Sequence, residues 1–307
     1  MQQKKDHHFF SDLLLLLTAM VWGFGFVAQR VGMEHLGPYS FNGFRFLLAG
    51  LCLIPLALLL RHKDKPALPE GRIHSGLAGS LAGLFLFAGA TLQQLGLQFT
   101  TAGKAGFITG LYVVLVPIIG LLLHQRTTIG AWLGAILATI GLYLLSVRGI
   151  NNISYGDLLE LVGTIFWALH VLTLGYLSPR TAPIQLAIVQ FFVCGLLSLG
   201  VAAVTESITS AGIRGAILPV LYGGCVSVGV GYTLQVLVQR RAHPAHAAIL
   251  LSLESPFAAF GGWWLLGEHL SLRGVIGCCL MLLGMLTSQL WPFLSQQTSV
   301  PDRRSAR

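Results

Sequence analysis

The stretch LLSLESPFAAF at residues 250–260 places a carboxylate and a proline inside an otherwise apolar run. A carboxylate within a bilayer costs about 2.5–3.5 kcal/mol on insertion scales, so an acidic residue at that depth indicates function. Pro256 follows Glu254 by two residues, and proline removes a backbone donor and loosens a helix locally. We therefore interpret this stretch as a buried, slightly opened wall of a polar cavity within a membrane-spanning helix.

A second stretch, LYVVLVPIIG at residues 111–120, carries its proline in the matching place. Further matches follow in the same order, 139 to 145 positions apart: Trp22 and Trp167, Pro38 and Pro183, Gly50 and Gly195, Gln93 and Gln235, Lys104 and His246, Pro117 and Pro256, Gly134 and Gly277, and Gly141 and Gly284. Matches of Trp, Pro and Thr-Leu-Gln are not generic between apolar helices. The pattern therefore predicts an internal duplication.

The composition excludes a soluble protein. Of 307 residues, 54% are hydrophobic and 10% are charged, and the mean hydropathy is +0.75; soluble domains have about 25% charged residues. The net charge of +8 is spread over short loops, so we expect no nucleic-acid partner. The five cysteines lie in apolar segments without disulfide or metal spacing, so we expect no metal and no cofactor.

Ten apolar stretches approach the roughly 20 residues that a membrane-spanning helix needs. They are residues 12–30, 38–60, 75–98, 101–124, 128–148, 156–178, 183–205, 215–239, 244–267 and 272–293. The first stretch resembles a signal peptide, but Trp22-Gly23-Phe24-Gly25 stands where a cleavage site would need small residues. We therefore predict that it is the first transmembrane helix.

We predict an all-α polytopic membrane protein with ten transmembrane helices, arranged as two inverted five-helix repeats. Five is an odd number, so the second repeat enters from the opposite side, and such repeats are typical of transporters with a site near mid-membrane. The expected parts are a cytoplasmic tail at 1–11, a first repeat at 12–148, a periplasmic linker at 149–155, a second repeat at 156–293 and a cytoplasmic tail at 294–307. Thirteen of the 19 Lys and Arg residues then lie on the side of the two termini and five on the other, which favours cytoplasmic termini.

Several motifs resemble the EamA type of the drug/metabolite transporter (DMT) superfamily. They are AMVWG at 19–23, Arg45, TTA at 100–102 followed by Pro117, and ESP at 254–256 followed by LLGEHLS at 265–271. The first half departs from the pattern, because LHQR at 123–126 lacks the Gly-Glu element of the second half. The resemblance covers about residues 12–292. It implies a carrier of the bacterial inner membrane that exports metabolites or amino acids, without fixing the substrate.

The polar residues inside the expected spans are the candidate binding residues, and each has a structural alternative. Glu254 is either a proton-responsive or substrate-binding group, or a carboxyl satisfied by its neighbours. Arg45 either extends to the outer interface or binds an anionic group in the cavity. The repeat partners Gln93 and Gln235 are costly in lipid, so we expect them to face the interior, as helix–helix bonds or as cavity lining.

Aromatic and imidazole groups complete the predicted site. His170 could titrate near neutral pH or serve as a packing residue. Trp22 and Trp167 could form aromatic walls with a cation–π option for amines, or pack between helices. The predicted substrate-binding residues are Trp22, Arg45, Gln93, Tyr112, Trp167, His170, Tyr232, Gln235 and Glu254. We expect Glu268, near the outer end of the ninth span, to order the turn into the tenth.

The sequence carries no Walker A motif, no Gly-x-Ser-Gly and no His-Glu-x-x-His, so ATP-driven transport and these intramembrane enzymes are disfavoured. We predict a secondary-active transporter that works by alternating access, with proton exchange at Glu254 as the coupling step. The alternatives are a flippase for a lipid-linked or amphiphilic substrate and an intramembrane enzyme. The expected partners are the lipid bilayer, a small-molecule substrate and protons, with the chain acting as a monomer or homodimer.

Overall fold

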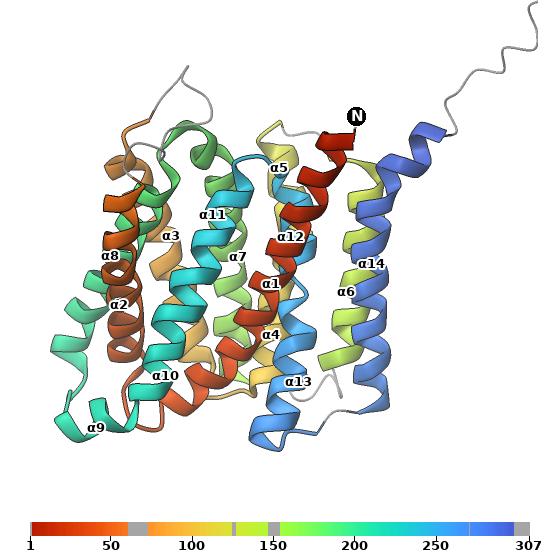
Figure 1. The fold of residues 1–307 in the computed structure, drawn as a ribbon. Coiled ribbons are helices and arrows are strands. Elements are labelled where there is room, and N and C mark those ends of the chain that lie inside the picture. The colour runs from red at the N-terminus through yellow and green to blue at the C-terminus, as the bar shows by residue number, and fades with distance from the viewer. Residues whose placement is uncertain (1, 61–72, 125–126, 147–153, 270, 298–307) are drawn as a thin grey trace, which may run out of the picture.

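The computed structural model describes residues 2–60, 73–124, 127–146, 154–269 and 271–297, and within these ranges every regular element is helical. The helices run roughly side by side in one bundle (Figure 1). Eight helical stretches are long and apolar enough to cross a membrane, and two shorter apolar ones lie at Ile129–Gly141 and Leu272–Ser288. Large apolar side chains such as Leu59 and Leu218 are 82% and 73% exposed. The chain is therefore a polytopic membrane protein, as predicted.

The first three helices are α1 (Gln2–Gly32), α2 (Pro38–Leu59) and α3 (Ser75–Gly96). Proline stands in the first turn of α2, where a missing backbone donor is tolerated. Helix α1 begins at Gln2, before the predicted start of the first span at residue 12, and its stretch long and apolar enough to cross a membrane is Phe10–Gly32. The physical reason is that residues 2–11 contain neither glycine nor proline, and nothing in them stops a helix from extending.

Two predicted spans are interrupted near the middle. The expected span 101–124 consists of α4 (Ala102–Gly110) and α5 (Tyr112–Leu122). The expected span 244–267 consists of α12 (Pro244–Leu251) and α13 (Glu254–Leu266). A proline follows each break within a few residues and cannot donate to the preceding turn. The second break lies immediately before Glu254, where the sequence predicted an opened helix.

The next helices are α6 (Ile129–Ser146), α7 (Tyr155–Leu177), the short 3₁₀ helix η2 (Ser178–Arg180) and α8 (Pro183–Thr205). Helix α7 starts with a capping box, in which the Ser154 side chain accepts from the Asp157 backbone and the Asp157 side chain accepts from the Ser154 backbone. Most of the predicted linker, residues 149–153, lies outside the described residues.

The remaining elements are α9 (Ser210–Gly215), α10 (Ile217–Leu221), the π-helix η3 (Tyr222–Tyr232), α11 (Thr233–Gln239) and α14 (Leu272–Gln297). The π-helix contains four glycines, and π segments occur often at functional sites. Helix α14 continues past the predicted end at residue 293. The rest of the predicted C-terminal tail, residues 298–307, lies outside the described part of the chain.

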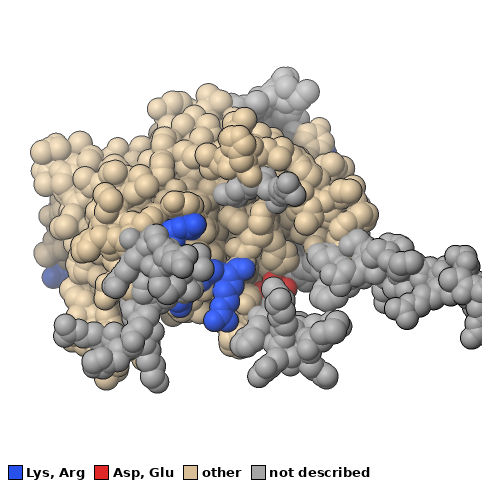
Figure 2. All heavy atoms as spheres, turned by 90° about the horizontal axis from the view of Figure 1, so that it is seen from above, with Lys and Arg blue, Asp and Glu red and all other residues tan. Residues whose placement is uncertain are grey.

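The helices pack in pairs around a central group. Helix α6 packs along α14 at one edge of the bundle, α2 packs along α8, and α3 packs against α7 and α8 (Figure 1). Helix α1 contacts α13 and η3. The N-terminus and the C-terminal end of α14 lie at the same end of the bundle (Figure 1). Figure 2 shows that end, where Lys and Arg side chains gather between segments that are not described.

Glycines allow the closest helix contacts. A Cβ built on Gly134 would lie 2.7 Å from the carbonyl oxygen of Gly284, and one on Gly141 would lie 2.5 Å from that of Gly277. Only glycine permits such an approach of two backbones, and small residues serve this purpose in membrane bundles. The α6–α14 pair is therefore held by backbone contact along its length.

Candidate functional site

A cavity of about 440 Å³ lies in the middle of the bundle. All nine predicted substrate-binding residues line it, together with Phe26, Gln29, Thr109, Val171 and Ser227. They come from α1, α2, α3, α4, α5, α7, η3, α11 and α13.

Arg45 lies in the cavity wall and is 3% exposed. Its Nε donates to Asn42 Oδ1 at 3.0 Å, and Asn42 Nδ2 donates to the Ala90 carbonyl at 3.0 Å. The guanidinium sits over the Phe46 ring, 4.9 Å from its centroid. Of the two predicted placements of Arg45, the structure shows the one in the cavity. Among the described residues no carboxylate pairs with Arg45, so a buried positive charge is available to an anionic group.

Glu254 is the first residue of α13 and is 4% exposed. Its carboxyl faces the hydroxyl of Tyr112, and neither its Oε1 nor that hydroxyl has a further partner among the described residues. The adjacent Ser255 hydroxyl donates to the Gly106 carbonyl and fixes α13 against α4. Buried polar atoms in proteins nearly always have partners, so these two atoms mark a place for a ligand or for water.

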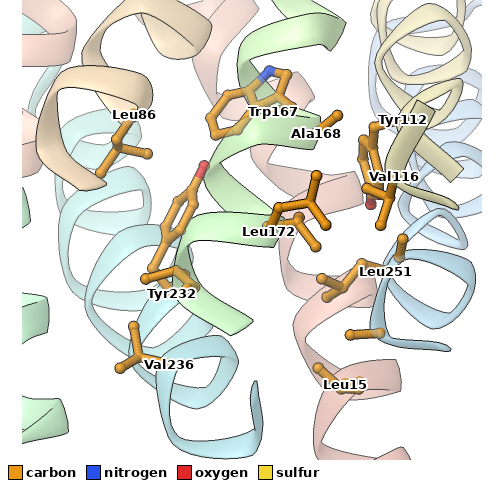
Figure 3. Packing of buried hydrophobic residues seen from close by; sticks show 14 of the residues in the cluster. Leu15, Leu86, Tyr112, Val116, Trp167, Ala168, Leu172, Tyr232, Val236 and Leu251 are labelled. Carbon is orange, nitrogen blue, oxygen red and sulfur yellow. The ribbon is translucent and has the colours of Figure 1, made fainter. Parts of the chain in front are cut away.

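An aromatic cluster forms one wall of the cavity around Tyr232. The Tyr232 ring lies 4.4 Å from the Trp22 ring and is stacked on Trp167 at 6.1 Å with an interplanar angle of 22°. Figure 3 shows Trp167 and Tyr232 facing each other between neighbouring helices. The Trp22 indole donates to the Ser227 carbonyl at 3.0 Å, whereas the Trp167 indole has no partner among the described residues. The ring faces can accept a cation.

Amide groups and an imidazole supply the remaining polar surface. Gln93 Nε2 donates to Gln29 Oε1 at 3.1 Å, and Gln29 donates in turn to a backbone carbonyl within α1. Gln235 is 1% exposed and its Oε1 has no partner in the described chain. His170 Nε2 lies 3.0 Å from Gln190 Oε1, while its Nδ1 has no partner there. His170 thus joins α7 to α8 and also lines the cavity.

Glu268 makes a contact that was not predicted, in addition to its place in the turn after α13. Its carboxylate accepts from the backbone N–H groups of Ala102 at 3.0 Å and Gly103 at 3.2 Å, which are the start of α4. Glu206 does the same for α2, accepting from Tyr39 and Ser40 at 2.8 Å each. A carboxylate is favourable at a helix N-terminus. The prediction that Glu268 orders the turn into α14 omitted this contact, because sequence spacing does not show which distant helix start lies beside it.

One contact between polar side chains of different helices lies at each end of the cavity region. Lys104 Nζ pairs with Asp157 Oδ2 at 2.5 Å, joining the starts of α4 and α7, and the Thr100 hydroxyl donates to Asp157 Oδ1 at 3.0 Å. At the opposite end, His246 Nε2 lies 2.8 Å from Asp12 Oδ1, joining the start of α12 to α1. The polar cavity lies between these two contacts.

Sequence reasoning missed four polar residues at or near the cavity. Gln29 and Glu160 lie inside the expected spans, so their polar side chains could have been identified from the sequence as candidates for the cavity. Glu160 is completely buried. Thr109 and Ser227 gave no such signal, since hydroxyl residues are common in membrane helices and bond to their own backbone.

The comparisons with known proteins agree with this architecture. The EamA-like transporter family matches the chain twice, over residues 9–147 and 154–288. An uncharacterized transporter of Archaeoglobus fulgidus is 31% identical over 285 residues, which cover 92% of this chain and 86% of that protein. The uncharacterized inner membrane transporter YedA of Escherichia coli K12 is 27% identical over 280 residues, covering 85% of this chain and 86% of YedA.

One chain of a solved crystal structure aligns with a TM-score of 0.71 at 17% identity, covering 94% of this chain and 99% of that one, and it shares the fold. The family matches cover most of the chain and include the motifs at residues 19–23 and 254–256 on which the resemblance rested. The predicted recognition is thereby confirmed. The chain belongs to the EamA-like transporter family of the drug/metabolite transporter superfamily, and it is a membrane transporter and not an enzyme.

Proposed function

We propose that this protein is a ten-helix secondary-active transporter that exports small zwitterions such as amino acids by alternating access. In this proposal, α4 with α5 forms the fourth span, η3 with its flanking helices the eighth, and α12 with α13 the ninth. Helices α6 and α14 cross as the fifth and tenth spans. The two repeats keep the predicted bounds of 12–148 and 156–293, except that the terminal helices extend beyond them.

Reciprocal contacts support the inverted repeats. If a two-fold axis relates two halves and residue i contacts j, then the partner of i contacts the partner of j. Gly134 approaches Gly284, and Gly141 approaches Gly277; Gly134 matches Gly277 in the repeat, and Gly141 matches Gly284. The family also matches the chain as two separate segments.

Two further pairs follow the same rule. A Cβ on Gly231 would meet the Trp22 ring, and one on Gly89 would meet the Trp167 ring. Asp12 contacts His246 and Asp157 contacts Lys104, with Asp12 and Asp157 standing 145 positions apart. An axis in the membrane plane would place these two ion pairs at opposite faces, as alternating access requires.

The observation that carries the substrate class is a buried guanidinium and a buried carboxyl in one cavity, each without an ion-pair partner among the described residues. Arg45 offers donors that fit a carboxylate. Glu254 and the ring faces of Trp22 and Trp167 suit an ammonium group. A zwitterion satisfies both ends at once, and the buried, polar lining favours a water-soluble substrate over a lipid.

The expected location is the bacterial inner membrane with both termini in the cytoplasm. One of the relatives is named an inner membrane transporter. The common end of the bundle that holds both chain ends fits this orientation (Figure 1). A single chain encloses the cavity, so transport needs no second copy. Opening and closing of the Lys104–Asp157 and Asp12–His246 contacts would expose the cavity to one side at a time.

Glu254 is the proposed coupling group, with His170 as a second proton-exchanging residue of the cavity. A carboxyl that exchanges its proton while the cavity changes sides links transport to the proton gradient. Gln preserves the shape of the side chain and removes the exchangeable proton. We therefore expect Glu254→Gln to abolish accumulation driven by a pH gradient, while substrate exchange at equal pH continues.

The test uses proteoliposomes loaded with a panel of radiolabelled L-amino acids, with and without an imposed pH gradient. Glu34→Gln, which alters an exposed carboxylate, is the matched control. Unchanged coupling in Glu254→Gln would overturn the proton role. Transport of amphiphilic or lipid-linked compounds, with no amino acid moved by the wild type, would overturn the substrate class in favour of a flippase.

A further inference from the structure

Glu160 is a second buried carboxyl, and the proposed mechanism does not use it. It lies on α7 five residues after the helix start, about 8 Å along the axis at 1.5 Å per residue. Its side chain is completely buried. Oε2 accepts from the Thr109 hydroxyl at 3.1 Å, and Oε1 has no partner among the described residues. Thr109 itself lines the central cavity.

The carboxyl sits at the interface between α4 and α7. Nearer the end of the same interface, Lys104 on α4 pairs with Asp157 on α7. One turn beyond Glu160, the Thr164 hydroxyl donates to the Ile108 carbonyl of α4 at 3.0 Å. Any motion that separates α4 from α7 at this end must therefore part Glu160 from Thr109.

In the part of the chain that the structure describes, Glu160 has no cation as an ion-pair partner. The titratable groups that face it are Asp157 and Lys104 at the helix starts, which pair with each other, and Tyr112 and Glu254 across the cavity. Helix α3 packs on Glu160 at Gly96 and has no ionisable side chain along Ser75–Gly96. An ionised carboxylate buried without a counter-ion is strongly unfavourable. The packed interface therefore suits the protonated carboxylic acid.

We propose that Glu160 is a proton-binding site whose access to water is controlled by the α4–α7 interface. In the packed interface the residue is a carboxylic acid. When α4 and α7 separate, the bond to Thr109 breaks, water reaches Oε1 and Oε2, and the O–H bond gives its proton to that water. Closure reverses the transfer, and no electrons move. This inference rests on the proposed function, because the separation is the opening of one end of the transporter.

The site has two routes for its proton. One leads to the aqueous phase at the Lys104–Asp157 end, and the other leads through the Thr109 hydroxyl to the cavity. In an exporter, Glu160 takes a proton from the external phase, which allows that end to close. When that end opens again, the proton returns to the external phase, so opening and closing of this end depend on the external pH.

Infrared spectroscopy of substrate-free protein in liposomes tests the site without any transport assay. The carboxylic C=O stretch reports protonated carboxyl groups. We expect Glu160→Gln to remove one component of this band at neutral pH, and Thr109→Val to shift the same component through loss of one hydrogen bond. The exposed Glu34→Gln should leave the band unchanged. A band identical in wild type and Glu160→Gln would overturn the proposal.

A cross-link tests the control of access. In the Lys104→Cys/Asp157→Cys variant, oxidation ties α4 to α7, and we expect hydrogen–deuterium exchange of the Glu160 component to slow at least tenfold and to recover on reduction. Equal exchange rates in both forms would overturn the role of the interface. If Glu160→Gln is too unstable to reconstitute, Glu160→Asp should keep a protonated component at a shifted position, and its absence counts against the site. A confirmed Glu160 band in a protein that moves no amino acid would leave this site standing and reject the proposed substrate.

Discussion

Arg45 and Glu254 owe their positions to neighbours that contribute no charge. Asn42 holds the Arg45 guanidinium from one side, while Gly223 of η3 leaves room for its stem. Glu254 stands at the helix break, where Gly23 lets α1 approach the Glu254 backbone. At this scale the cavity holds a guanidinium and a carboxyl that are kept apart by packing, so each can meet one end of a substrate.

The first prediction concerns recognition of a carboxylate. Arg45→Lys keeps the positive charge but loses the planar, two-donor geometry. We expect at least a tenfold rise in KM for L-amino acids in proteoliposome exchange, because one of two charge-assisted hydrogen bonds is lost. Amino-acid methyl esters, which lack the carboxylate, should be discriminated against by the wild type and much less by the variant. Arg273→Lys, at an exposed residue, is the control. Equal KM values for Arg45→Lys and wild type would contradict the role.

Helix interruptions and glycine contacts are the features that shape the elements. The breaks in the α4–α5 and α12–α13 stretches place Tyr112 and Glu254 at helix starts, and the π-helix η3 turns Tyr232 toward the two tryptophans. Among the described residues, α6 and α14 contribute nothing to the cavity lining and instead form a tight pair. The interrupted helices thus build the cavity together with the continuous helices α1, α2, α3 and α7, whereas α6 and α14 brace the bundle at one edge.

The second prediction tests the close packing of α6 against α14. A side chain at Gly134 would collide with the Gly284 backbone, and overpacking of this kind costs about 1–3 kcal/mol. We expect Gly134→Val to lower the thermal midpoint of the detergent-solubilised protein by several degrees, as about 1 kcal/mol shifts Tm by roughly 2–4 °C in larger domains. Gly200→Ala meets nothing within 4 Å and should leave the midpoint unchanged. Equal midpoints for wild type and Gly134→Val would show that the helices separate without cost.

For the molecule as a whole, the Lys104–Asp157 and Asp12–His246 contacts lie at opposite ends of the cavity, and in the proposed mechanism their opening controls access. Both are formed in this structure, and each joins a helix of one repeat to a helix of the other: α4 to α7, and α1 to α12. Glu206 and Glu268 also reach across, from one repeat to helix starts in the other. Motion between the repeats must therefore act on these contacts first.

The third prediction concerns disulfide cross-links that hold each end of the cavity closed in turn. Asp12→Cys/His246→Cys and Lys104→Cys/Asp157→Cys are made in a background without the native cysteines. We expect oxidation of either pair to reduce net transport by more than tenfold, with recovery on reduction, because alternating access needs both ends to open. A cysteine pair at the exposed Leu58 and Leu196 sites is the lipid-facing control and should not respond. Full transport with either end cross-linked would contradict alternating access.

The sequence by itself determined the class of protein, the helical spans and the family. It also picked the nine polar and aromatic residues that the structure gathers around one cavity, because a bilayer tolerates such side chains only in a protected interior. Their binding of substrate stays a prediction. Pro256 likewise indicated the interruption before Glu254, since the effect of proline on a helix is local.

Only the tertiary structure decided which polar groups have partners. Arg45 turns into the cavity and not toward the interface, and Glu268 caps a helix start more than 160 positions away. One oxygen of Glu160 accepts a hydrogen bond from Thr109, whereas the other has no partner among the described residues. A sequence fixes local backbone preferences and which side chains must avoid lipid. Whether a buried charge is paired depends on side chains brought together from distant parts of the chain, and that is set by how the helices pack.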